Sequence, residues 1–188
     1  GVRRAVLSGN SLGGGVAWRT AVQHPERVSR LVLVDASGYP LQSTSVPLGF
    51  RLAQIDWLQP LMSQLLPRRM IAASVRNVYA DPNKVTPELV DQYYELTLRA
   101  GNRVSLSQRL KLRETDEQYA GLIKTIRQPT LILWGAKDQL ITEPSGQRFH
   151  QDIAGSQYVV FDGLGHVPQE EDPARSVVPV LKFLTSSR

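Results

Sequence analysis

The feature that most constrains this chain is the stretch of residues 5–15, which reads AVLSGNSLGGG. A short apolar run passes into the pattern G-x-S-x-G, and residues typical of a helix follow. A sharp turn from strand to helix of this kind holds one side chain, here Ser11, above the end of a sheet. Because the strand and the helix approach closely there, we expect Gly9 and Gly13 to be required. The N–H of Leu12 then lies at the positive end of the helix.

A serine hydroxyl becomes a useful nucleophile only beside a base, and the base needs an anion that orients it. Three histidines are available as the base. His24 and His150 lie near the ends of predicted helices, where a surface role accounts for them. His166 follows a predicted strand at residues 158–161, in a loop that contains two glycines. Open α/β sheets place their chemistry at the carboxyl ends of strands, so the pattern favours His166.

Three aspartates compete for the role of the anion. Asp35, Asp138 and Asp162 each come at or shortly after the end of an apolar run. An aspartate at such a place is also common simply as a turn residue. Asp162 is so close to the histidine in sequence that a loop-bracing role suits it better. Asp138 is favoured over Asp35 because it completes the chain order Ser, Asp, His that is expected after a turn of this type.

Short apolar runs bounded by turn residues predict a parallel sheet whose two faces are both buried. The runs are residues 3–8, 30–35, 130–134 and 158–161. Helical stretches at residues 12–24, 144–151 and 173–184 lie between or after them, which predicts right-handed crossovers. The fold class is therefore α/β, with a parallel sheet of about four strands.

Between the second and third predicted strands the pattern becomes helical. The expected helices are residues 46–66, with a break at Pro60, then 68–80, 86–101, 106–113 and 116–126. Thr86 before Pro87 is a typical helix start, and Gly101 is a plausible helix end. We therefore expect a core made of residues 1–38 and 129–188, and an all-helical insertion at residues 39–128. This insertion is long for a connection between two strands.

Charge and composition narrow the range of functions. The net charge is +5 and there is no cysteine, which excludes disulfides, a cysteine nucleophile and thiolate metal sites. The densest basic group, residues 99–113, runs into acidic residues and carries no nucleic-acid-binding motif. We therefore expect a solvated helix face and no nucleic-acid partner. No apolar run is long enough to predict a transmembrane segment, and a cytoplasmic location is the expectation.

Three motifs together resemble the α/β-hydrolase fold family. GNSLGG is similar to its nucleophile elbow, WGAKDQLI to its acid loop and GLGHVPQEEDP to its histidine loop. The helical insertion resembles the cap domain of the branch that contains carboxylesterases, meta-cleavage-product (carbon–carbon) hydrolases, epoxide hydrolases and haloalkane dehalogenases. In the last two groups the nucleophile is an aspartate. Ser11 at this position points instead to hydrolysis of an ester or of a carbon–carbon bond.

The resemblance implies a role for each candidate residue. Ser11 attacks a carbonyl, His166 acts as base and then acid, Asp138 orients His166, and the N–H of Leu12 holds the oxyanion. Water then cleaves the acyl-enzyme, with no metal and no cofactor.

The expected substrate is a small hydrophobic ester or related acyl compound. The aromatic residues of the helical insertion fit an apolar pocket, although such residues more often form the insertion's own core. The candidates for substrate contact are Trp57, Tyr93 and Tyr94, with Phe50 and Leu61 beside them. Two alternatives stay open: a carbon–carbon hydrolase of the meta-cleavage-product type, and a catalytically silent fragment or binding protein.

The chain opens at Gly1, almost inside its first predicted strand. Members of the family usually carry several further strands before the elbow, together with a loop that supplies a second oxyanion N–H. We therefore expect an N-terminally truncated chain in which residues 3–8 form an open sheet edge. An edge of this kind invites pairing with another chain, so self-association is expected.

Overall fold

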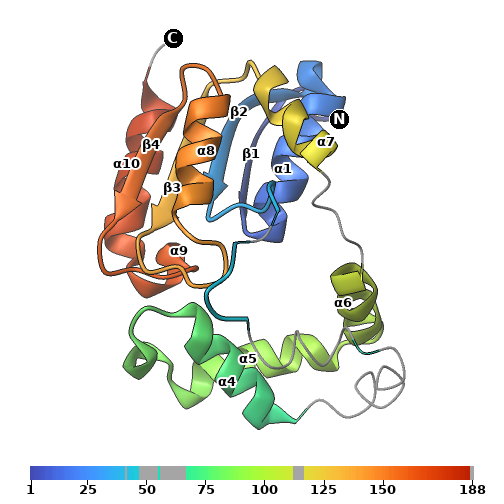
Figure 1. The fold of residues 1–188 in the computed structure, drawn as a ribbon, viewed down its shortest axis with the longest axis vertical. Coiled ribbons are helices and arrows are strands. Elements are labelled where there is room, and N and C mark those ends of the chain that lie inside the picture. Colours follow the sequence, from blue (N-terminus) through green and yellow to red (C-terminus); the bar gives the residue numbers. More distant parts are fainter. Residues whose placement is uncertain (41, 47–54, 56–66, 112–116, 187–188) are drawn as a thin grey trace.

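The computed structural model describes residues 1–40, 42–46, 55, 67–111 and 117–186, and within them it shows a four-stranded parallel sheet. The strands are β1 (Ala5–Asn10), β2 (Val28–Val34), β3 (Thr130–Gly135) and β4 (Gln157–Phe161), in the order β1-β2-β3-β4. Each neighbouring pair is parallel (Figure 1). The predicted α/β fold class is confirmed, and each predicted strand lies within about two residues of an observed one.

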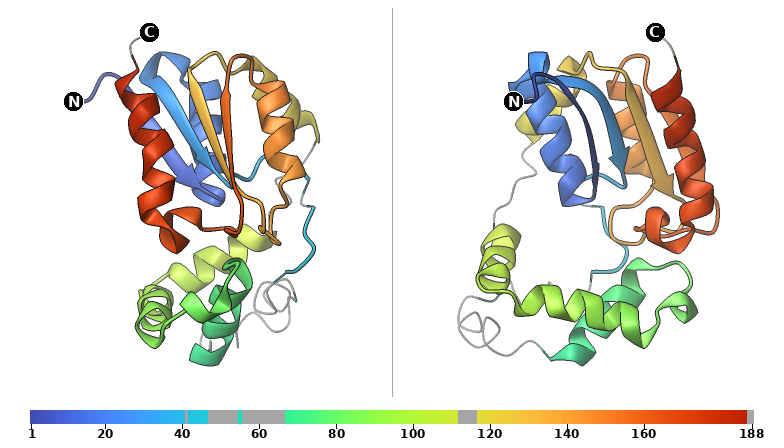
Figure 2. Two further views of the ribbon diagram at one scale, coloured as in Figure 1. Left: turned by 90° about the vertical axis from the view of Figure 1, so that its left-hand side faces the viewer. Right: turned by 180° about the vertical axis from the view of Figure 1, so that it is seen from behind.

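Helices cover the two faces of the sheet. On one face α1 (Leu12–Gln23) and α8 (Pro144–Asp152) pack against inward side chains of β2 and β3, with Trp18 and Phe149 fully buried. On the other face α10 (Pro173–Thr185) contributes Phe183 to a second apolar cluster. Both faces of β2 and β3 are buried, as a parallel sheet requires, and Figure 2 shows this layering.

Beyond the carboxyl ends of the strands lie α4 (Arg68–Val78), α5 (Pro87–Leu98), α6 (Asn102–Lys111) and the short helix α9 (Pro168–Glu171), whereas short α7 (Glu117–Gly121) lies near the opposite end of the sheet (Figure 1). The described residues also contain the 3₁₀ turns Pro25–Arg27, Pro82–Lys84 and Leu122–Thr125. Thr86 caps α5 as expected, because its hydroxyl accepts a hydrogen bond from the N–H of Leu89 at 3.2 Å. The helix predicted at residues 46–66 falls almost wholly outside the described residues.

Two helix boundaries differ from the expectation. The helix α5 ends at Leu98, before Gly101, and α6 begins at Asn102, four residues ahead of the predicted start. Gly101 has a φ of 83°, so it forms the left-handed turn between these helices. The last predicted helix of the insertion is instead the pair α7 and the turn Leu122–Thr125.

The end of the helical insertion packs with the sheet. Ala120, Ile123 and Ile126 are buried in the cluster that contains Trp18 and Phe149. The helices α4 and α5 form a separate cluster, whose buried members are Ala72, Val75, Tyr79, Val85, Val90 and Val167. We therefore propose that the core begins again near residue 117, rather than at residue 129.

The turn from β1 to α1 depends on glycine at positions where backbone and side chains meet. A Cβ on Gly9 would lie 2.2 Å from the carbonyl carbon of Gly13, and one on Gly14 would lie 2.5 Å from the Cβ of Ala36. A Cβ on Gly13 would meet no atom within 4 Å. The prediction for Gly9 holds, whereas the close approach attributed to Gly13 is made at Gly14, one residue later.

We predict opposite outcomes for alanine at the two ends of the motif. Gly9→Ala should lower the free energy of unfolding by about 1–3 kcal/mol or more, because the new methyl group has to displace backbone. Gly13→Ala should change it by less than about 1 kcal/mol, since open space receives the methyl group. Urea unfolding of both variants beside the parent chain measures this. Equal losses in the two variants would show that the turn does not have this geometry.

Candidate active site

Ser11 lies at the tip of the turn, held by its backbone. Its N–H donates to the carbonyl of Val34 at 2.9 Å, and its own carbonyl accepts from the N–H of Ser37 at 3.0 Å. Its φ is 54°, an unusual value for a residue with a side chain. The helix α1 begins at the next residue, Leu12, and the first N–H groups of a helix have no acceptor within it. The structure therefore contains the strained turn at Ser11 that the sequence predicts.

His166 lies in the loop after β4, residues 162–167, which we call the histidine loop. The residue is 4% exposed. Its carbonyl accepts a hydrogen bond from the side-chain amide of Asn10 at 2.9 Å, and the same amide donates to Val34 at 3.2 Å. Because Asn10 immediately precedes Ser11, this amide joins the histidine loop to the turn that carries the serine. The pattern G-x-S-x-G contains Asn10, but its role was not apparent from the sequence.

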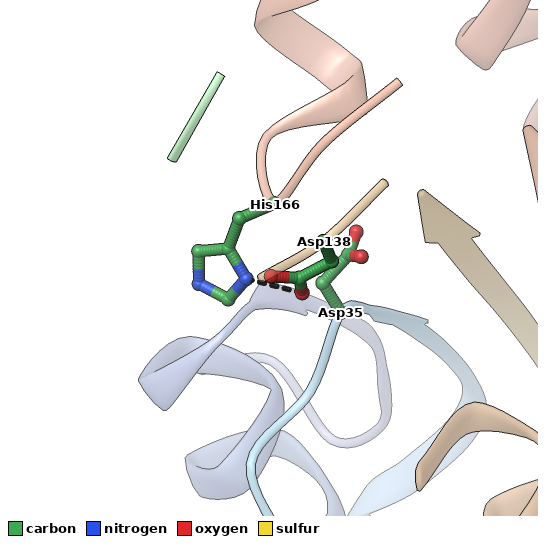
Figure 3. Close-up of side chains that lie close together, drawn as sticks. All are labelled: Asp35, Asp138 and His166. Atoms are coloured by element: carbon green, nitrogen blue, oxygen red, sulfur yellow. Dashed lines mark hydrogen bonds and ion pairs between the residues drawn. The ribbon is translucent and has the colours of Figure 1, made fainter. Parts of the chain in front are cut away.

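The imidazole of His166 is paired with Asp138. Nδ1 lies 2.6 Å from Oδ2 of Asp138, and both side chains are buried. The other oxygen, Oδ1, accepts the N–H groups of Leu140 at 2.8 Å and Ile141 at 3.0 Å. These bonds fix the carboxyl group in the turn after β3, and Figure 3 shows the pair. The structure thus brings together His166 and the aspartate that the chain order favours.

The other histidines and Asp162 lie elsewhere. The ring of His150 stacks on Tyr158, and its Nδ1 lies 2.8 Å from Oγ of Ser156. His24 is exposed and follows the last residue of α1 as its C-terminal cap. Asp162 is exposed, and its carbonyl accepts a hydrogen bond from Arg175 at 2.9 Å. These contacts agree with the surface and loop-bracing roles expected for the three residues.

Asp35 lies beside the pair, and its state is chemically distinct. It is fully buried, with a φ of 41°. Its Oδ1 accepts the N–H of Gly135 at 2.9 Å, whereas Oδ2 is buried without a partner among the described residues. Burial raises the pKa of the Asp35 carboxyl well above its ordinary value, and the nearby charge of Asp138 raises it further. Two neighbouring carboxyl groups in such a place do not both ionise readily, so Asp35 tends to keep its proton.

Asp35, Asp138 and His166 are also close enough together to bind a metal ion. One ligand atom each from Asp35, Asp138 and His166 lies within 4.8 Å of the others. Here, however, Nδ1 of His166 and Oδ2 of Asp138 are engaged with each other at hydrogen-bond distance. The arrangement as it stands therefore orients an imidazole and accepts its proton.

The candidate substrate contacts in the helical insertion divide into three cases. Trp57, with Phe50 and Leu61, lies outside the described residues. Tyr93 lines a cavity of about 600 Å³ between α5 and α9, and its hydroxyl donates to Glu170 at 2.8 Å. Tyr94 is half-buried and does not line that cavity.

We predict that replacing the carboxyl group by an amide affects kcat strongly at Asp138 and weakly at Asp35. Asp138→Asn should lower kcat by about 10⁴, because the amide no longer stabilises the imidazolium. Asp35→Asn should keep kcat within about tenfold, since an amide resembles the protonated acid and still accepts from Gly135. Steady-state hydrolysis by the two variants measures this, and the reverse ranking would make Asp35 the orienting acid.

The raised pKa of the Asp35 carboxyl predicts that the stability of the folded chain depends on pH. A group with a raised pKa binds more protons in the folded chain than in the unfolded one, so stability falls as pH rises. The fall begins near the ordinary aspartate pKa of about 3.9 and continues to the raised pKa of Asp35. The free energy of unfolding of Asp35→Asn should lack this decline. Parallel profiles for the variant and the parent would contradict it.

No helix in the described ranges combines the length and the apolar character needed to cross a lipid bilayer.

Comparison with known proteins points the same way as the geometry. The sequence signature of the alpha/beta hydrolase fold matches residues 1–173. A 2-hydroxy-6-oxononadienedioate/2-hydroxy-6-oxononatrienedioate hydrolase from a Pseudomonas species is 33% identical over 188 residues, which include 98% of this chain and 64% of that protein.

Solved structures show the same fold. The meta-cleavage product hydrolase CumD from Pseudomonas fluorescens IP01 has a TM-score of 0.76 at 28% identity, covering 97% of this chain and 65% of CumD. An esterase from Thermogutta terrifontis has a TM-score of 0.74 at 22% identity, covering 96% and 64%. The chain thus spans just under two thirds of the length of these proteins. It belongs to the α/β-hydrolase fold family, and a meta-cleavage product hydrolase is among the proteins it resembles in both sequence and fold.

Proposed function

We propose that the protein is a serine hydrolase in which Ser11, His166 and Asp138 form the catalytic triad. The observation that carries the proposal is the buried bond of 2.6 Å between Nδ1 of His166 and Oδ2 of Asp138. The link from Asn10 to the carbonyl of His166 supports it, because this link joins the histidine loop to the turn at Ser11. The alternative of a silent fold requires this arrangement to have no chemical use.

The proposed mechanism follows from the orientation of the imidazole. Because Nδ1 donates to a carboxylate, Nε2 is left as an acceptor for the proton of the serine hydroxyl. Oγ of Ser11 attacks the substrate carbonyl as that proton passes to Nε2. The N–H of Leu12, at the start of α1, stabilises the oxyanion. Nε2 then gives the proton to the leaving group, and a water molecule deprotonated by the same nitrogen releases the acid.

For the bond that is cleaved, the relatives favour a carbon–carbon bond. The Pseudomonas relative is named as a 2-hydroxy-6-oxononadienedioate/2-hydroxy-6-oxononatrienedioate hydrolase, and CumD is named as a meta-cleavage product hydrolase. We propose a 2-hydroxy-6-oxo-dienoate as the substrate class, in which the serine attacks the 6-oxo carbon. An ester, which the sequence alone favours, is the second candidate, because the same triad and acyl-enzyme serve it.

The cavity beside Tyr93 is the proposed place for part of the substrate. Its lining combines apolar side chains of α5, such as Leu89 and Leu96, with the polar groups of Lys84 and Glu170. Glu170 follows His166 by four residues, so the cavity adjoins the histidine loop. Burial and the carboxylate of Glu170 both raise the pKa of Tyr93, which therefore keeps its hydroxyl proton.

A cytoplasmic location of the protein stays a prediction.

We predict that Ser11→Ala removes hydrolysis. In the full natural protein kcat should fall by several orders of magnitude, to the ~10³–10⁴ enhancement over water that remains when a triad is lost. Assays with a 2-hydroxy-6-oxo-dienoate and with a short p-nitrophenyl ester measure this, and the ratio of the two kcat/KM values assigns the preferred bond. More than about a tenth of the parent kcat in Ser11→Ala would refute a serine nucleophile.

We also propose that the chain of 188 residues associates with itself through one face of the sheet. β1 is the edge strand of the described sheet, and Val6 on it is 43% exposed. Val6 pairs in register with Arg30, whose guanidinium donates to carbonyls at the end of α10, so Val6 faces the α10 side. On that helix Val178 and Leu181 are 60% and 56% exposed. These exposed apolar side chains lie on the same side of the sheet, and exposed apolar side chains beside an open sheet edge promote association.

We predict that charge on this surface reduces association. The double variant Val178→Lys, Leu181→Lys should have a lower mass by light scattering than the parent chain at equal concentration, because two lysines resist burial. Leu98→Lys, at an exposed position on α5, is the matched control and should behave as the parent does. A parent chain that stays monomeric at every concentration tested would contradict the proposal.

A further inference from the structure

The histidine loop is bound to the end of α4 by backbone contacts. The N–H of His166 donates to the carbonyl of Val78 at 2.8 Å. The adjacent residue, Gly165, lies so close to the same segment that a Cβ on it would come 2.6 Å from the carbonyl oxygen of Val78 and 2.7 Å from the nitrogen of Ala80. Residues 78–80 therefore pack directly on the two residues that set the position of the imidazole.

The carboxyl group of Glu171 bridges the two segments. Its Oε1 accepts the N–H of Gly165 at 2.6 Å, and its Oε2 accepts the N–H of Ala80 at 2.9 Å. The residue is 7% exposed and ends the short helix α9. The ammonium group of Lys84 donates to the backbone carbonyl of Glu171 at 3.0 Å, which fixes the residue from a third direction.

The chemistry of this bridge requires a carboxyl group with two accepting oxygens. Burial raises the pKa of Glu171, while hydrogen bonds from the backbone N–H groups of Gly165 and Ala80 act in the opposite direction by favouring the ionised form. An ionised carboxyl accepts at both oxygens, whereas an amide has one acceptor and one donor group. Glutamine at this position would therefore place an N–H against one of the two backbone N–H groups.

We propose that Glu171 is a positioning residue for His166, and that it does this by joining the histidine loop to residues 78–80 of the helical insertion. The inference rests on the proposed role of His166 as the base. Because Gly165 immediately precedes His166, a shift of the bridge moves the imidazole relative to both Asp138 and Ser11. A displacement of about 1 Å in such a group lowers turnover by about 10²-fold.

The inference also gives the helical insertion a part in the chemistry. Two backbone groups of residues 78–80 hold the histidine loop in place. The carbonyl of Val78 accepts the N–H of His166, and the N–H of Ala80 donates to the carboxyl group of Glu171. Movement of α4 is thereby transmitted to His166 through two backbone contacts and one side chain. An insertion that only shaped the substrate pocket would alter KM and leave the orientation of the base unchanged.

The test compares Glu171→Gln with Glu95→Gln in the full natural protein. Glu95 is an exposed glutamate on α5, so its variant controls for the loss of one negative charge. Glu171→Gln should lower kcat by about 10–100-fold, because the orientation of the base is lost. KM does not decide the test, since Glu171 also lines the cavity beside Tyr93. Glu171→Asp keeps the charge but is too short to reach both N–H groups, and its kcat should lie between those of the parent and Glu171→Gln.

A second readout does not depend on turnover. A proton shared between imidazole Nδ1 and a carboxylate gives a low-field signal in the proton NMR spectrum. In Glu171→Gln this signal should shift or broaden, and in Glu95→Gln it should match the parent. An unchanged signal with kcat within twofold of the parent would overturn the inference. If Ser11→Ala instead retained activity, the proposed function would fail while the signal still reported whether Glu171 orients His166.

Discussion

A buried hydrogen bond, from Nδ1 of His166 to Oδ2 of Asp138, is the interaction on which the site depends. It joins the loops after β3 and β4, and it settles which ring nitrogen remains open to a substrate or to Ser11. A buried bond of this kind stabilises the site only where the polar atoms around it also have partners. The other oxygen of Asp138, Oδ1, accepts the N–H groups of Leu140 and Ile141.

The second carboxyl group sets the electrostatic condition of the same region. Asp35 shares the buried space with Asp138 and His166, and two negative charges there would repel each other. A proton on Asp35 leaves one negative charge, on Asp138, for the imidazolium that forms in the proposed mechanism. Glu171 is a further nearby carboxyl group that raises the pKa of Asp35. The charge balance of the site thus extends beyond the three residues of the proposed triad.

The fold was largely predictable from the sequence because its signals are local. Four apolar runs, the turn at Ser11 and the Thr86 cap each depend on neighbouring residues, and each was found within about two residues of its expected place. The pairing of His166 with Asp138 was predictable from chain order, since parallel strands end at one edge of the sheet. The helix predicted at residues 46–66 lies largely beyond the described residues, and its structure stays a prediction.

What the sequence did not reveal depends on contacts between distant segments. Nothing near Gly13 or Gly14 shows which of them meets Ala36, because that contact joins α1 to the segment after β2. The bridge of Glu171 to Ala80 spans 91 residues, and the link of Asn10 to His166 spans 156. Asp35 was considered only as a rival to Asp138, whereas the structure places it beside that residue as a second, more readily protonated acid.

The central claim is that the turn at Ser11 and the histidine loop assemble into one reactive site. Labelling with a fluorophosphonate, followed by mass spectrometry of the digested protein, tests it most directly, because the reagent needs both an activated serine and its base. The account predicts a single label on Ser11 in the full natural protein, and its loss in His166→Ala. Labelling of another residue, or of Ser11 at an equal rate without His166, would contradict it.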